Sequence, residues 1–210
     1  MTHSDIIARI CAAAPVIPVL TIERVEDAQP LARALVAGGL PTLEITLRTD
    51  AALEAIAAIA EVEGAVVGVG TLLTSTQVHD AKSAGAIFGV SPGVTPTLIT
   101  AAQESDLPLL PGSATATEAM RLLEQGFVIQ KFFPAEAVGG ALALGSLAGP
   151  LPQIKFCPTG GITPENAKKY LALPNTLCVG GSWIAPKALV ASGSWEEITQ
   201  IARRAADLLL

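Results

Sequence analysis

The chain has 210 residues, of which 50% are hydrophobic and only 15% are charged, and its formal net charge is −6. Its apolar runs are broken by glycine and proline and stay below the roughly 18 residues of a membrane span, and the amino terminus has no secretory signal pattern, so we expect a cytoplasmic protein without membrane contact. The basic residues are scattered, which argues against a nucleic-acid partner.

Strand-like and helix-like segments alternate along the chain. Residues 4–14 predict a short leading helix, residues 195–210 predict a closing helix, and stretches such as 25–39 and 49–63 predict helices between strands. The predicted strands are mostly β-branched or aliphatic and end in Gly, Pro, Ser or Thr. They cover residues 16–23, 42–48, 65–72, 86–93, 108–113, 127–133, 154–161 and 176–183.

This alternation predicts an α/β fold, specifically a (β/α)8 TIM barrel with a short N-terminal helix, in which residues 1–210 form a single catalytic domain. A doubly wound open sheet is the alternative, and it is less favoured because no G-x-G-x-x-G pattern follows the first strand. In a barrel, the functional site lies at the carboxyl ends of the strands.

Lys131 is the most informative residue at those ends. It lies in the apolar run FVIQKFFPAE, where alternation places it on the same face as Ile129 and Phe133. Burial of an ammonium group is costly and favours the neutral amine, which can attack a carbonyl and form a Schiff base. The alternative is a lysine whose stem lies on apolar surface and whose head reaches water.

The segment TLEITLR places Glu44 and Arg48 on one face of the second strand, pointing into the barrel. The two could form an interior ion pair. Alternatively, Arg48 could bind a carboxylate and Glu44 could exchange protons near neutral pH. Thr71 shares the parity of Val67 and Val69, and we expect it to face inward at the rim, where it could bind a carboxylate or cap the next helix.

The last two predicted strands end in PTGGIT, which holds Gly160 and Gly161, and in VGGSW, which holds Gly180 and Gly181. Paired glycines let backbone N–H groups approach an anion, and barrels often bind phosphate at these two loops. Ser182 could add a hydroxyl donor. We therefore expect a phosphate site here.

Other reactive groups are less promising. Lys155 is a rival nucleophile, but it stands earlier in its strand than Lys131 does in its own. The three cysteines lack the paired spacing of a metal site, and we expect them to be reduced thiols. The chain has only two histidines, which argues against a His-based catalytic triad or a His-ligated metal. No metal or cofactor is expected.

Seven segments resemble the bacterial 2-dehydro-3-deoxy-6-phosphogluconate (KDPG) aldolases of the Entner–Doudoroff pathway, whose relatives also act on 4-hydroxy-2-oxoglutarate (KHG). They occur in the family order and span nearly the whole chain; KFFPAE and CPTGGI are the most specific. The segments are LVAGGLPTLEITLRT, VVGVGTL, FGVSPG, LLPGSAT, KFFPAE, FCPTGGIT and CVGGSW.

The resemblance implies a metal-independent class I aldolase and a homotrimer. It implies that Lys131 is the Schiff-base lysine, that Glu44 is the general acid/base, and that Arg48 and Thr71 bind the carboxylate end of the substrate. We place Phe133 and Pro92 at that end too. The resemblance implies a phosphate cradle from both glycine pairs and Ser182, and we add Thr159.

Two other functions remain open on the same fold. One is a phosphosugar isomerase, epimerase or synthase, which would share the phosphate loops, and the other is a non-catalytic barrel that binds a phosphorylated ligand.

Overall fold

The computed structural model describes residues 2–209, in which short parallel strands alternate with helices. The strands are β1 (Val16–Leu20), β2 (Thr42–Thr46), β3 (Val66–Gly70), β4 (Phe88–Val90), β5 (Leu109–Leu110), β6 (Gly112–Ser113), β7 (Ile129–Phe132), β8 (Lys155–Pro158) and β9 (Val179–Gly181).

The helices mostly follow the strands one by one. The α-helices are α1 (His3–Ala12), α2 (Ala28–Ala37), α3 (Ala52–Ala60), α4 (Ser75–Ser83), α5 (Pro96–Glu104), α6 (Ala116–Glu124), α7 (Gly140–Ser146), α8 (Pro164–Leu171), α9 (Lys187–Ala191) and α10 (Trp195–Ala206), and the 3-10 helices are η1 (Val25–Asp27), η2 (Glu136–Val138) and η3 (Asp207–Leu209). None of the helices in residues 2–209 has the length and apolar character needed to cross a membrane.

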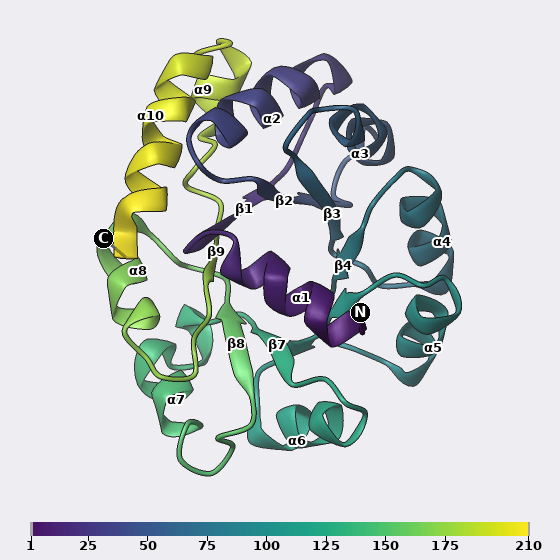
Figure 1. The fold of residues 1–210 in the computed structure, drawn as a ribbon, viewed down its shortest axis with the longest axis vertical. Helices are drawn as coiled ribbons and strands as arrows, with labels where there is room; N and C mark the ends of the chain where they lie inside the picture. Colours follow the sequence, from purple (N-terminus) through teal and green to yellow (C-terminus); the bar gives the residue numbers. More distant parts are fainter. Residues whose placement is uncertain (1, 210) are drawn as a thin grey trace.

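The strands form a curled parallel sheet surrounded by helices (Figure 1). Six strands pair in the order β5-β4-β3-β2-β1-β9, and three pair in the order β6-β7-β8. Pro111 separates β5 from β6 because proline has no N–H for the ladder. Between β8 and β9 the contact consists of the isolated bridges Phe156↔Thr176 and Thr159↔Gly180. The predicted α/β fold is confirmed.

Apolar side chains form two layers, one outside and one inside the curled sheet. Leu43 and Ile45 of β2 belong to the outer layer, which packs against the helices. The inner cluster contains Ile7, Ile10 and Cys11 of α1 together with Ile17, Phe88, Val90, Leu110, Ile129, Cys157 and Cys178. Figure 1 shows α1 lying across the middle of the ring of strands. This helix therefore closes the amino end of the sheet, and the carboxyl ends remain available for a site.

Threonines fix the start of four helices that follow strands. Thr74, Thr95, Thr115 and Thr163 are the N-caps of α4, α5, α6 and α8, and three of them form capping boxes with the residue at the third helical position. A capping threonine satisfies N–H groups that the helix itself leaves unpaired. The loops at the carboxyl ends of the strands consequently stop at defined residues.

The structure corrects several predicted boundaries. The third predicted strand, 65–72, ends at Gly70, and the last, 176–183, is limited to Val179–Gly181. The predicted strand residues that fall outside these strands include Thr71 and Leu72 after β3, and residues 176–178, Ser182 and Trp183 around β9. The leading helix occupies His3–Ala12, and the closing helix ends at Ala206 and continues as η3; the predicted position 210 lies outside the described residues.

Candidate active site

Lys131 and Glu44 lie together inside the sheet although they are 87 positions apart in the chain. Lys131 Nζ lies 3.3 Å from Glu44 Oε1, and the two residues are 5% and 3% exposed. Curling of the sheet brings β2 and β7 face to face and creates this contact. A buried polar group without a partner costs several kcal/mol, roughly, so each of the two side chains offsets part of the cost of burying the other.

Glycines on β3 make room for the Glu44 carboxylate. A Cβ on Gly70 would stand 2.7 Å from Glu44 Cγ and closer still to Oε1. Gly68, two residues earlier on the same face, lies under the ring of Phe88, and a Cβ there would stand 2.5 Å from Cδ1 of that ring. Sequence reasoning missed both positions, although glycines at alternate positions of a strand opposite a carboxylate are a readable signal of close approach.

Phe133 lies beside Lys131, and Pro92 lies against Gly112, the residue that pairs with Lys131 in the ladder. The Phe133 ring centroid is 5.1 Å from Lys131 Nζ. Gly112 pairs with Lys131 in the ladder, and a Cβ at Gly112 would collide with the carbonyl of Pro92. The segment that contains Pro92 is therefore packed directly onto the strand beside β7.

Arg48 and Thr71 meet at the rim, where Arg48 Nε donates a hydrogen bond of 3.3 Å to Thr71 Oγ1. Arg48 lies two residues beyond the end of β2 and is exposed. The predicted reason for the placement of Thr71 is wrong, because Val67 and Val69 belong to the outer layer of the core and not to the interior. Thr71 leaves the strand alternation through a φ of 62°, a conformation that is strained for a β-branched residue.

The two glycine pairs lie side by side. A Cβ on Gly180 would stand 2.9 Å from Thr159 Cγ2 and closer to Oγ1, and the Thr159↔Gly180 bridge joins the two loops. Gly181 lies under the ring of Trp183, where a Cβ would overlap it, and Ser182 is exposed between them. The structure thus brings together the residues that were predicted for the phosphate site.

The Gly160–Gly161 turn needs glycine at both positions, because φ is +101° at Gly160 and +77° at Gly161. Its carbonyls are held from both sides. Glu136 N donates to Gly160 O at 3.1 Å, and Asn166 Nδ2 donates to Gly161 O at 3.0 Å. The turn leads into the amino end of α8, where the helix dipole favours an anion, although Pro164 has no N–H and the Thr163–Asn166 capping box occupies other donors.

Of the remaining reactive groups, Lys155 lies outside this site, whereas Cys157 lies beside it, with its Sγ 4.0 Å from Thr159 Oγ1. Lys155 starts β8 and donates to Pro174 O at 2.8 Å, so the rival lysine is at the opposite end of its strand from Thr159. The cysteines gather in the inner cluster under α1. Hydrogen bonds to Cys11 and Cys157, and then burial, raise the pKa of the Cys178 thiol well above its usual range.

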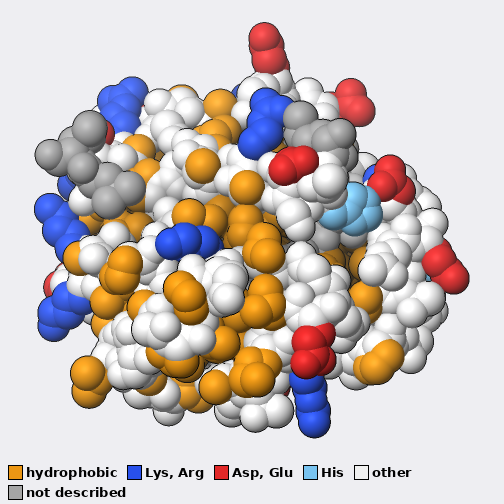
Figure 2. All heavy atoms as spheres, turned by 60° about the horizontal axis from the view of Figure 1, so that its bottom comes forward, with side chains coloured by type: hydrophobic (Ala, Val, Ile, Leu, Met, Phe, Trp, Pro, Cys, Tyr) orange, Lys and Arg blue, Asp and Glu red, His pale blue; other side chains and the backbone are white. Residues whose placement is uncertain are grey.

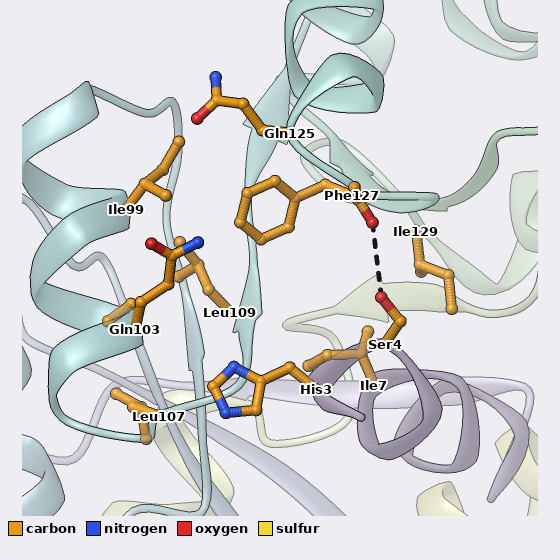
Figure 3. A pocket seen from close by; sticks show the side chains of 12 residues that line it. His3, Ser4, Ile7, Ile99, Gln103, Leu107, Leu109, Gln125, Phe127 and Ile129 are labelled. Carbon is orange, nitrogen blue, oxygen red and sulfur yellow. Dashed lines mark hydrogen bonds between the residues drawn. The ribbon is translucent and has the colours of Figure 1, made fainter. Parts of the chain in front are cut away.

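A cavity of about 120 Å³ lies at the amino end, between α1, α5 and the end of α6 (Figure 3). At its edge His3 Nε2 pairs with Asp106 Oδ1 at 2.7 Å, and Ser4 donates to the carbonyl of Gly126. Apart from His3, its described lining consists of apolar side chains, a serine and the amides of Gln103 and Gln125, with no lysine or carboxylate. This cavity therefore offers no candidate nucleophilic lysine, and the candidate active site is the one around Lys131 and Glu44.

Comparison with known proteins gives a consistent result. Residues 7–201 match the family model described as KDPG and KHG aldolase. The KHG/KDPG aldolase of Escherichia coli strain K12 is 49% identical over 199 residues, which cover 94% of this chain and 93% of that protein.

Solved structures agree with this match. A KDPG aldolase of Zymomonas mobilis ZM4, crystallised with 3-phosphoglycerate, is 49% identical, with a TM-score of 0.92 over 99% of this chain and 97% of that chain. A KDPG aldolase of Legionella pneumophila, in which pyruvate was captured at low pH as a covalent carbinolamine intermediate, is 46% identical, with a TM-score of 0.92 over 95% of this chain and 98% of that chain.

Proposed function

The chain belongs to the KDPG and KHG aldolase family, and from that premise we propose that it cleaves 2-dehydro-3-deoxy-6-phosphogluconate to pyruvate and glyceraldehyde 3-phosphate through a Schiff base on Lys131. The protein is a class I aldolase, a carbon–carbon lyase. The observation that carries the assignment of the lysine is its buried contact with Glu44, at 3.3 Å.

The first step makes the carbonyl a better electron acceptor. Lys131 transfers a proton to Glu44, and the resulting neutral amine attacks the C2 ketone to form a carbinolamine. Loss of water, with a proton returned to the leaving hydroxyl, gives a protonated imine on Nζ. Glu44 is the group within 3.3 Å of that nitrogen and is the natural carrier of both protons.

The second step breaks the C3–C4 bond. Glu44 removes the proton of the C4 hydroxyl, directly or through a water, and the electron pair of the bond moves onto the imine to give an enamine. Glyceraldehyde 3-phosphate leaves. Protonation of the enamine at C3 and hydrolysis of the imine then release pyruvate and free Lys131.

The surrounding residues hold the two ends of the substrate. Arg48 and Thr71, already hydrogen-bonded to each other, face the carboxylate. Phe133 and Pro92 line the pyruvyl end. Thr159, Gly160, Gly161, Gly180, Gly181 and Ser182 receive the phosphate, where binding energy orients the reacting end.

We also propose that residues 1–210 form one closed eight-stranded barrel that works in the cytoplasm as a homotrimer. The short break at Pro111 and the bridges between β8 and β9 support closure. Figure 2, which brings the α6–α7 side forward, shows hydrophobic side chains gathered on the surface. Met120 of α6, Val138 of η2 and Leu142 of α7 are exposed by 51%, 36% and 84%, and these apolar side chains support a subunit interface.

The direct test is to compare steady-state cleavage of KDPG and of 4-hydroxy-2-oxoglutarate. We expect KDPG to have the higher kcat/KM, because the second substrate has no phosphate for the glycine loops. Lys131→Met should abolish both activities. Cleavage of neither substrate by the wild-type protein would overturn the proposal, and a wide preference for the unphosphorylated substrate would overturn the assignment of the loops.

A further inference from the structure

Tyr170 and Glu136 form a pair that the mechanism above does not use. Tyr170 lies on α8 with its side chain fully buried, and its hydroxyl donates a hydrogen bond to Glu136 Oε1 on η2. Burial, and then the hydrogen bond to the carboxylate, raise the pKa of the phenol above its usual range. The phenol is therefore a permanent donor to this carboxylate at any physiological pH.

Glu136 is also in direct contact with the phosphate loop. A Cβ on Gly161 would stand 2.7 Å from both Cβ and Cγ of Glu136, so the stem of the glutamate lies against the Cα of Gly161. Its backbone N–H holds the carbonyl of Gly160. On the other side, a Cβ on Gly140 would stand 3.3 Å from Oε1. Glu136 is itself exposed, so the stem contact with Gly161 and the bond from Tyr170 are what fix the position of its carboxylate.

A carboxylate at this position can weaken phosphate binding. It carries the same sign of charge as the ligand and can accept hydrogen bonds from the same N–H groups. Because Cγ lies next to the position that a Cβ of Gly161 would take, rotation about the side chain of this exposed glutamate can bring its oxygens toward the Gly160–Gly161 turn. The bond from Tyr170 keeps the carboxylate on the far side.

We infer that Tyr170 and Glu136 are positioning residues for the phosphate group of the substrate: the phenol holds the carboxylate away from the loop, and the carboxylate stem holds the loop in its anion-binding shape. The inference rests on the proposed function. Its consequence is that this pair sets the preference for a phosphorylated over an unphosphorylated 2-keto acid, without touching the reacting carbons.

The test uses Tyr170→Phe, Glu136→Gln and the double variant. In Tyr170→Phe the carboxylate loses its donor, so the KM for KDPG should rise about tenfold, the change expected from loss of a hydrogen bond to a charged group. The KM for 4-hydroxy-2-oxoglutarate should change little. Glu136→Gln keeps an acceptor for the phenol but removes the charge, so its KM for KDPG should be no higher than that of the wild type.

The double variant separates positioning from simple packing. With no charge left to control, Tyr170→Phe in the Glu136→Gln background should raise the KM for KDPG much less than it does alone. Equal effects in both backgrounds, or equal changes for both substrates, would overturn the inference. If Tyr170→Phe does not fold, Glu136→Gln alone still decides, because a raised KM for KDPG would contradict the repulsion.

Failure of this inference can be told apart from failure of the proposed function. Pyruvate carries no phosphate, so borohydride trapping of pyruvate on Lys131 should be the same in all three variants and in the wild type. Absence of the adduct in the wild-type protein sinks the aldolase assignment. Normal trapping without a change in substrate preference sinks only the role of the Tyr170–Glu136 pair.

Discussion

Gly70→Ala adds one methyl group directly beneath the proposed proton carrier. The new Cβ would stand 2.7 Å from Glu44 Cγ, whereas non-bonded carbon atoms sit about 3.5–4.0 Å apart. Because Glu44 is only 3% exposed, its side chain cannot swing into solvent. The carboxylate must therefore shift by about 1 Å within the site and lengthen its contact with Lys131.

Two effects of different size follow from this shift. Overpacking of a filled interior costs roughly 1–3 kcal/mol, which lowers the Tm by about 2–4 °C per kcal/mol in a chain of this length. A 1 Å misplacement of a catalytic group costs about a hundredfold in rate. We expect kcat for KDPG to fall about a hundredfold, measured at about 25 °C, where the variant should still be folded. Pyruvate release is followed continuously with a coupled dehydrogenase, and the Tm is measured by circular dichroism.

Gly68→Ala is the matched control. It lies on the same strand and face, and the three atoms nearest to its Cβ would all belong to the ring of Phe88. Its Tm should fall by a similar amount, while kcat should stay within a few-fold of the wild type. If Gly70→Ala keeps a wild-type kcat, or if both variants lose kcat equally, the position of Glu44 is not what limits the rate and the reasoning fails.

Three further outcomes follow. Thr71→Gly relieves the strain of a φ of 62° and should raise the free energy of unfolding in urea by about 1 kcal/mol. It should also lower kcat/KM, because Arg48 loses its hydrogen-bond acceptor. An unchanged free energy of unfolding would mean that Thr71 is not strained. Gly161→Ala, at φ +77° and against Glu136, should raise the KM for KDPG about tenfold and spare pyruvate trapping, and an unchanged KM would remove this loop from the phosphate site. The pKa of the Cys178 thiol is raised in the folded protein, so its contribution to stability is present below the unfolded-state pKa of about 8.5 and is lost as the pH rises above it. The free energy of unfolding in urea should therefore fall above about pH 8.5. Cys178→Val should make that fall smaller.

The placement of Lys131 and Glu44 is predictable from the sequence because it depends on strand alternation and on the cost of a charge in an apolar run. Those two rules concern neighbours within one strand. The topology then brings the two strands together, since parallel βα units place their carboxyl ends at one edge. The same rules separate Lys155, which begins its strand, from Lys131.

The remaining features depend on contacts between distant segments or on single dihedral angles. Thr71 reaches the rim through a positive φ that no alternation rule contains, and the parity argument for it was wrong. The Tyr170–Glu136 bond joins positions that are 34 residues apart, and nothing in either local sequence marks it. Gly70 pairs with Thr46 in the β2–β3 ladder and Glu44 pairs with Gly68, so the close approach of Gly70 to the Glu44 side chain is diagonal and depends on the register of the two strands.

The central claim is that Lys131 forms a covalent imine with the keto acid. The most direct measurement is incubation with pyruvate and borohydride, followed by mass spectrometry of the digested protein. We predict one reduced pyruvyl adduct, located on Lys131, which is lost in Lys131→Met and retained in Lys155→Ala. An adduct on Lys155 or on another lysine, or no adduct on folded wild-type protein, would contradict the account.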